Sequence, residues 1–261
     1  MLTADTIAPH LDTRWLGRAL QGFAELDSTN TTAREMAEAG AGHGTVVIAD
    51  AQRQGRGRLG RSWASPAGKN LYLSAVLRCE LPVERLTQVS LLAGVAVCET
   101  VREWCAAEIK WPNDVLSGGR KVAGILVEMD GTGPQRVLIV GIGVNLNTAL
   151  DDFPEELRDK AGSLSLVSGA PVDRARFAGR LLGHLELRYE QCLRDGFAPI
   201  AAAWRELTPL IGRHIRVQEP GATVEGTVLG LADDGALRLR LPDGREHRVV
   251  AGDVTVVGGY G

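Results

Sequence analysis

The chain has 261 residues, of which 44% are apolar and 23% are charged, so it can bury a core like an ordinary globular protein. This composition excludes disorder, a collagen helix and a coiled coil as the main architecture. Lys and Arg number 29 and Asp and Glu number 32, which gives a net charge of −3. The chain therefore lacks the basic excess of a protein that coats nucleic acid or a membrane, and any anion site must come from local clustering.

Hydrophobic periodicity predicts mixed helices and strands over the first 210 residues. Ser28 is a plausible N-cap for the first helix and Gly40 a stop. Runs rich in β-branched or apolar residues predict strands, and a Gly-rich turn is expected at 131–134. In chain order we expect a helix over 29–39, strands over 45–51 and 71–77, a helix over 86–105, strands over 108–111, 122–129 and 136–144, and helices over 172–194 and 198–207.

The pattern changes near Ile211, where short alternating runs replace long helices. Pro220-Gly221, Asp234-Gly235 and Asp243-Gly244 are turn signals, and the last two are typical of hairpins. Several short strands in about fifty residues favour a small β-barrel. We therefore expect two domains, residues 1–210 and 211–261.

The cysteines and histidines indicate neither a disulfide framework nor a metal site. The four cysteines include no CxxC pair, and the five histidines are scattered without metal-ligand spacing. Residues 1–25 hold both charge signs and no long apolar run, so we expect no signal peptide and no transmembrane helix. These features favour a reduced, cytoplasmic protein.

Residues 52–61, the Arg–Gly loop, carry the strongest local positive charge. The segment reads Gln-Arg-Gln-Gly-Arg-Gly-Arg-Leu-Gly-Arg, with four arginines and no acid. Guanidinium groups suit phosphate and carboxylate, and glycines let backbone N–H groups approach an anion. The spacing Gly55-x-Gly57-x-x-Gly60 also matches a dinucleotide fingerprint, but Pro66 and Gly68 follow where a helix would have to form, so we reject that reading. The alternative is a solvated basic loop.

A second group of polar residues follows the strand predicted at 108–111. Pro112 breaks this strand, and the end of a strand is where ligand-binding groups are commonly presented. Lys121 opens the next strand, where its ammonium would reach the pocket formed by these polar groups, unless it is an ordinary surface lysine. Gly141 and Gly143 would let a base or ribose lie close to the backbone, or they mark a tight strand exit. The polar group consists of Lys110, Trp111, Asn113 and Asp114, with Asn145 at the end of the later strand.

Five ordered motifs together resemble those of the biotin protein ligases. They are Asp27-Ser-Thr-Asn30, Gln52 with Gly55-Arg-Gly-Arg-Leu-Gly60, Lys110-Trp-Pro-Asn-Asp114, Arg120-Lys-Val-Ala-Gly-Ile-Leu-Val-Glu128 and Gly141-Ile-Gly-Val-Asn145. The resemblance covers about residues 25–205, and the tail resembles the family's SH3-like C-terminal domain. It implies an α+β fold: a mixed sheet flanked by helices, like class II aminoacyl-tRNA synthetases, plus a small SH3-like β-barrel.

The resemblance also implies a reaction and its participants. Biotin and MgATP would give biotinyl-5′-AMP, and the biotinyl group would pass to a lysine of a biotin carboxyl carrier protein. Bifunctional members carry an N-terminal DNA-binding module, for which the roughly 25 residues before the first motif are too few. We therefore expect a monofunctional ligase with no DNA or membrane partner, which would be monomeric or a homodimer.

Site roles follow from the resemblance residue by residue. Lys121, Arg58 and Asp114 are the catalytic candidates. The candidates for binding biotin or its carboxylate are Ser28, Thr29, Asn30, Gln52, Arg56, Gly57, Arg58 and Lys121, and those for the adenylate are Arg58, Trp63, Lys110, Trp111, Asn113 and Asn145. Hydroxyl and amide groups suit the donors and acceptor of a ureido ring. For the two tryptophans, plain core packing is the alternative.

Two other functions compete with biotin ligation. A lipoate or octanoate ligase uses the same adenylate chemistry on a flexible acyl chain. A nucleic-acid-binding module would use the Arg–Gly loop and the C-terminal barrel, but the loop contains no Phe or Tyr for base stacking.

Overall fold

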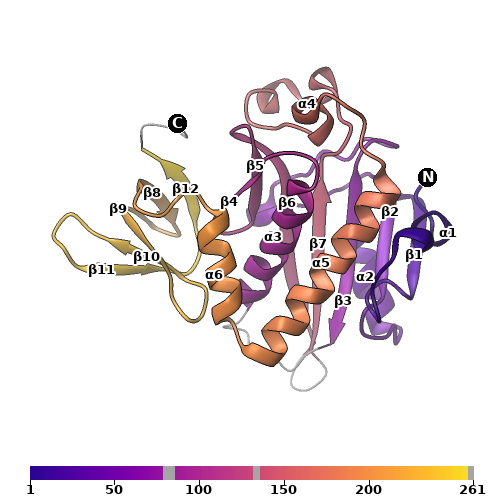
Figure 1. Ribbon diagram of the computed structural model, residues 1–261, viewed down its shortest axis with the longest axis horizontal. Coiled ribbons are helices and arrows are strands. Elements are labelled where there is room, and N and C mark those ends of the chain that lie inside the picture. The colour runs from indigo at the N-terminus through magenta and orange to yellow at the C-terminus, as the bar shows by residue number, and fades with distance from the viewer. Residues whose placement is uncertain (79–85, 132–135, 258–261) are drawn as a thin grey trace.

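The computed structural model describes residues 1–78, 86–131 and 136–257 (Figure 1). Its elements are α1 (Ala4–Ile7), β1 (Leu20–Leu26), α2 (Thr29–Glu38), β2 (Val46–Gln52), β3 (Leu71–Arg78), α3 (Leu86–Arg102), β4 (Glu108–Lys110), β5 (Asp114–Ser117), β6 (Arg120–Asp130), β7 (Val137–Val144), α4 (Leu164–Ser168), α5 (Arg174–Asp195), α6 (Ala198–Leu207), β8 (His214–Glu219), β9 (Ala222–Leu231), β10 (Leu237–Arg240), β11 (Glu246–Val249) and β12 (Asp253–Val256).

The described residues form a seven-stranded sheet in the order β1-β2-β3-β7-β6-β5-β4. β1 and β2 are parallel and the other neighbours are antiparallel, so the sheet is mixed. Successive side chains of a strand point to opposite faces. On β7, Val137 and Ile139 pack with α2, while Leu138, Val140 and Ile142 join the larger core with α3 and α5. The expected mixed sheet flanked by helices is confirmed, and Gly141 and Gly143 lie on the α2 face.

The long helices α3 and α5 pack against each other over the sheet (Figure 1). Asp173 caps α5 by accepting hydrogen bonds from the backbone N–H groups of Ala175 and Arg176. Farther along α5, the buried carboxylate of Glu186 accepts backbone N–H groups of residues 14, 15 and 16 at 2.7, 3.0 and 2.8 Å. Glu186 therefore ties the N-terminal segment to the helical layer.

Glu186→Ala should lower the free energy of unfolding by about 3 kcal/mol, because three N–H groups lose a charged acceptor in a poorly solvated site. Urea or thermal unfolding measures the loss. Glu38→Ala, at an exposed position on α2, is the control and should change stability little. Equal stability of the two variants would contradict the tie that we assign to Glu186.

The C-terminal residues form a five-stranded antiparallel sheet in the order β11-β10-β9-β8-β12. The three turn signals of the sequence lie between β8 and β9, β9 and β10, and β10 and β11. Gln88 Nε2 of α3 donates to the carbonyl of Asp233 at 2.7 Å, and Trp111 Nε1 donates to Gly235 at 3.3 Å. The smaller sheet is thus attached to the larger domain beside α6 (Figure 1).

Several expected boundaries were wrong. The helix expected to reach residue 105 ends at Arg102, and the strands β1 and β5 were not predicted. β1 alternates poorly in burial at a sheet edge, and β5 is only four residues long. Of the turn expected at 131–134, residues 132–134 lie outside the described residues, as does Cys79. Within the described segments, no helix has the length and apolarity needed to cross a membrane.

Candidate active site

A first cavity, only about 50 Å³, lies where α2 begins beside the end of β2. Gln52 Oε1 accepts the Thr29 backbone N–H at 2.9 Å and its hydroxyl at 3.2 Å. Ser28 caps α2 by position, but its hydroxyl makes no capping hydrogen bond, so it is available to line the cavity. The Ser74 hydroxyl of β3 lies 2.8 Å from Thr29 Oγ1 and 2.6 Å from Asn30 Oδ1. A set of uncharged donors and acceptors is thereby fixed at one end of the cavity.

Glycines on the sheet leave room for the side chains of Asn30 and Trp63 next to its strands. A Cβ at Gly141 would lie 2.1 Å from Asn30 Oδ1, and one at Gly143 would lie 2.7 Å from the Trp63 ring. Gly124 of β6 faces the same ring at 3.0 Å. In this structure, the side chains of Asn30 and Trp63 lie in the space next to Gly141 and Gly143.

Gly141→Ala should displace the Asn30 amide, because a distance of 2.1 Å between the new Cβ and Asn30 Oδ1 cannot be accommodated in place. We expect the KM for the substrate that binds in this first cavity to rise at least about tenfold. Steady-state kinetics and a melting curve would separate this effect from unfolding. Gly183→Ala on α5, where a Cβ meets nothing within 4 Å, is the control. An unchanged KM in a folded Gly141→Ala protein would contradict this role of the glycine.

A second cavity of about 480 Å³ adjoins the first, and its lining combines charged and amide side chains with the apolar Leu116, Phe153 and Leu157. Lys110, Asn113, Asp114 and Asn145 all line it. Asn113 Nδ2 donates to the Ile125 carbonyl at 2.9 Å and Asn145 Nδ2 to the Gly162 carbonyl at 3.0 Å, which fixes both amides. The polar groups at the strand end broken by Pro112 therefore line a single cavity, and the sequence predicted this grouping.

The two cavities share a wall formed by Gly57, Arg58, Trp63, Asn113 and Lys121. Lys121 Nζ lies 2.6 Å from Asp114 Oδ1 and 5.3 Å from the centre of the Trp63 ring. Arg58 donates to Asn113 Oδ1 at 3.1 Å. Two cations consequently stand where a group in one cavity would meet a group in the other.

Burial changes the acid–base properties of this wall. It lowers the pKa of the Arg58 guanidinium, against the opposing effect of the nearby Asp114 carboxylate. Burial also lowers the pKa of Lys110, whose charge Asp114 favours and Lys121 disfavours. Cations that are poorly hydrated interact strongly with an anionic ligand, so the site is prepared for negative charge.

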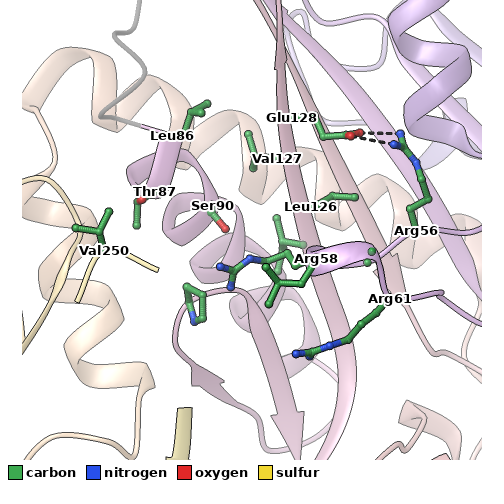
Figure 2. A pocket seen from close by; sticks show the side chains of 15 residues that line it. Arg56, Arg58, Arg61, Leu86, Thr87, Ser90, Leu126, Val127, Glu128 and Val250 are labelled. Carbon is green, nitrogen blue, oxygen red and sulfur yellow. Dashed lines mark hydrogen bonds and ion pairs between the residues drawn. The ribbon is translucent and has the colours of Figure 1, made fainter. Parts of the chain in front are cut away.

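Two of the predicted residues lie differently from the rest. Trp111 has 1% of its surface exposed and packs in the core, and it lines neither cavity. Arg56 lines the first cavity, but its guanidinium pairs with Glu128 on β6 at 3.0 and 2.9 Å. Figure 2 shows this pair at a third cavity of about 470 Å³, which Arg58 and Arg61 also line.

The sequence did not single out Ser74, Glu128 or Asp159 as site residues. Ser74 and Glu128 reach the first cavity's polar groups from β3 and β6, and Asp159 lines the second cavity. Glu128 is the last residue of the motif Arg120–Glu128, so its place in that motif could have identified it as a site residue. Ser74 and Asp159 carry none, because a single polar residue in a strand or loop has many uses.

Sequence comparison gives two matches that together cover most of the chain. The profile of the Biotin/lipoate A/B protein ligase family matches residues 22–145, and that of the Biotin protein ligase C terminal domain matches residues 210–257. The first match places the domain built on the mixed sheet in a class of ligases that includes both biotin and lipoate enzymes. With the relatives below, these matches show that the chain belongs to the biotin protein ligase family.

Relatives and solved structures agree with this placement. The chain is 40% identical to the Bifunctional ligase/repressor BirA of Bacillus spizizenii, over 90% of this chain and 73% of that protein. It is 38% identical to the Biotin–[acetyl-CoA-carboxylase] ligase of Mycobacterium tuberculosis, over 97% and 98%. The Aquifex aeolicus biotin protein ligase in complex with biotin and ATP superposes with a TM-score of 0.79 at 29% identity, over 92% of this chain and 99% of that one.

Proposed function

We propose that this ligase activates biotin with ATP to biotinyl-5′-AMP and transfers the biotinyl group to one lysine of a biotin carboxyl carrier protein. The observation that carries the proposal is the shared wall: two cavities of different chemistry meet at Arg58 and Lys121. Biotin, with an uncharged ureido ring, suits the first cavity, and the nucleotide suits the larger second cavity.

In the first half-reaction a biotin carboxylate oxygen attacks the α-phosphorus of ATP, and pyrophosphate leaves. Both reactants are anions, so their approach requires cations at the point of contact. Lys121 and Arg58 supply them, and Asp114 holds the Lys121 ammonium toward the wall. No side-chain nucleophile takes part, because the carboxylate itself forms the new bond.

Mg²⁺ would enter with ATP. Within the described residues, no group of three or more His, Cys, Asp and Glu side chains is arranged to hold a metal ion. Protein sites commonly hold Mg²⁺ through one or two carboxylates together with substrate phosphates. Asp114 and Asp159 both line the second cavity and provide such carboxylates, and the ion would offset phosphate charge there.

Biotin entry requires the Arg–Gly loop to move. A volume of about 50 Å³ holds only a few waters and is too small for a bicyclic ring. Arg58 and Trp63 close this space from the loop side and from the segment after it. The loop therefore acts as a lid that opens for biotin and closes over the adenylate.

In the second half-reaction a neutral lysine amine of the carrier attacks the biotinyl carbonyl carbon, and AMP leaves with the bonding electrons. The acceptor lysine belongs to a carrier domain of a biotin-dependent carboxylase, and we propose that the reaction takes place in the cytoplasm. We further propose that the boundary between the two domains lies between residues 210 and 211, and that the protein is a monomer or a homodimer. We also propose that it does not bind DNA sequence-specifically, which a salt-dependent gel-shift titration tests.

Biotin-dependent exchange of labelled pyrophosphate into ATP tests the activation step. Exchange with biotin but not with lipoate or octanoate is the expected result, because the ureido ring matches the fixed hydroxyl and amide groups around Thr29 and Asn30. Exchange that depends on lipoate alone would replace the proposal with the lipoate alternative. Transfer to a purified carrier domain, followed by mass spectrometry, tests the second step.

A further inference from the structure

One carboxylate, that of Glu128 on β6, joins the first cavity to the Arg–Gly loop. Asn30 Nδ2 donates to Glu128 Oε2 at 2.7 Å, from the start of α2. Arg56 donates from the loop to both oxygens at 3.0 and 2.9 Å (Figure 2). Arg34 of α2 lies 3.3 Å from Oε1. Glu128 thus holds groups from a helix and a loop on one strand.

These contacts determine which way the Asn30 amide faces. Its Nδ2 group points at two acceptors, Glu128 Oε2 and the Leu126 carbonyl at 3.3 Å, so its oxygen must face the Ser74 hydroxyl at 2.6 Å. Without the carboxylate, Asn30 Nδ2 would keep only its longer contact, with the Leu126 carbonyl, and the amide nitrogen and oxygen would be distinguished less well. A ureido ring would then meet a mixture of amide orientations.

The same carboxylate restrains the loop. A bidentate guanidinium–carboxylate pair fixes both distance and direction, and Glu128 is largely shielded, with 21% of its side chain exposed. The pair anchors the loop just before Arg58, the cation of the shared wall. The position of Arg58 accordingly depends on Glu128 through two residues of chain.

We propose that Glu128 is a positioning residue that holds the Asn30 amide and the Arg56 guanidinium on one carboxylate, so that biotin binding and closure of the Arg–Gly loop are coupled. The proposal rests on the proposed function for its substrate. The coupling is direct, because Asn30 and Arg56 both donate to the same oxygen, Glu128 Oε2.

Glu128→Gln is the sharpest variant, because it keeps the side-chain shape and replaces one acceptor oxygen with a donor that faces Asn30, Arg34 or Arg56. We expect the KM for biotin in pyrophosphate exchange to rise about tenfold or more, with a smaller change in kcat. We also expect biotinylation of a bystander protein to rise, since the loop retains the adenylate less well. Glu225→Gln, which breaks a strand-borne pair with Arg216 in the smaller sheet, is the control and should change neither.

Two double-mutant cycles separate coupling from general destabilisation. The effect of Glu128→Gln on the KM for biotin should largely disappear in an Asn30→Ala background. Its effect on bystander labelling should largely disappear in an Arg56→Ala background. Additive effects in either cycle, in proteins with intact melting transitions, would overturn the proposal.

A readout independent of catalysis keeps the two proposals distinguishable. In ligand-free protein, trypsin should cut the Arg–Gly loop about ten times faster in Glu128→Gln than in wild type or Glu225→Gln, because the anchor of the loop is lost. Unchanged cleavage would overturn the anchoring role whether or not the protein activates biotin. Wild-type protein without biotin-dependent exchange, but with faster loop cleavage in the variant, would instead overturn the proposed function alone.

Discussion

Lys121→Ala should lower biotin-dependent pyrophosphate exchange by about 10²–10³-fold, comparable to the loss of a preorganised transition-state donor. Lys121 lines both cavities, and its ammonium lies at the wall where carboxylate and α-phosphate would meet. Removing it leaves two anions facing each other and leaves Asp114 without its ion-pair partner. Single-turnover formation of the adenylate measures the effect directly.

The control is Lys69→Ala, which removes the Lys69–Asp152 ion pair, of similar exposure, outside the three cavities described. Its exchange rate should stay within about twofold of wild type, as surface pairs contribute about 0–1 kcal/mol. Thermal melts of both variants show whether either has unfolded. Wild-type exchange by folded Lys121→Ala protein would refute its assignment as the bridging cation.

Arg58→Gly should release the adenylate roughly ten to a hundred times more readily, while adenylate formation falls less. Removing the guanidinium loses a charge-assisted contact of about 1.5–3 kcal/mol. The change also adds a glycine to a loop that already has Gly55, Gly57 and Gly60, which favours open conformations. The mixed anhydride then meets water and foreign amines.

Biotin label on an unrelated lysine-rich protein, with MgATP present, is the measurement for this variant. Arg53→Gly makes a matched control, since Arg53 belongs to the same loop but pairs with Glu25 and Asp27 outside the cavities. It should label the bystander no more than wild type does. If Arg58→Gly forms adenylate and yet labels no better than its control, the loop does not act as a lid through Arg58.

The sequence alone was sufficient for the family, the fold class and the reaction. The chemistry-bearing residues stand in short motifs, so their type and order are visible without a structure. Lys110 ends β4, Asp114 begins β5 and Lys121 lies near the start of β6. These three strands are consecutive and adjacent in the sheet, so the structure brings the three side chains to one cavity. Strong alternation and long apolar helices likewise predicted most elements within a few residues.

The tertiary structure decided which side chains meet across the sheet. Strand order places β3 beside β7 and β7 beside β6, so Asn30, Ser74 and Glu128 converge although nearly a hundred residues separate the first and last. The side chain of Trp111 is buried in the core, while the ring of Trp63 lies next to Gly124 and Gly143. Such contacts depend on the order and the register of strands that are not consecutive in the chain. A local sequence pattern predicts neither the strand order nor the register.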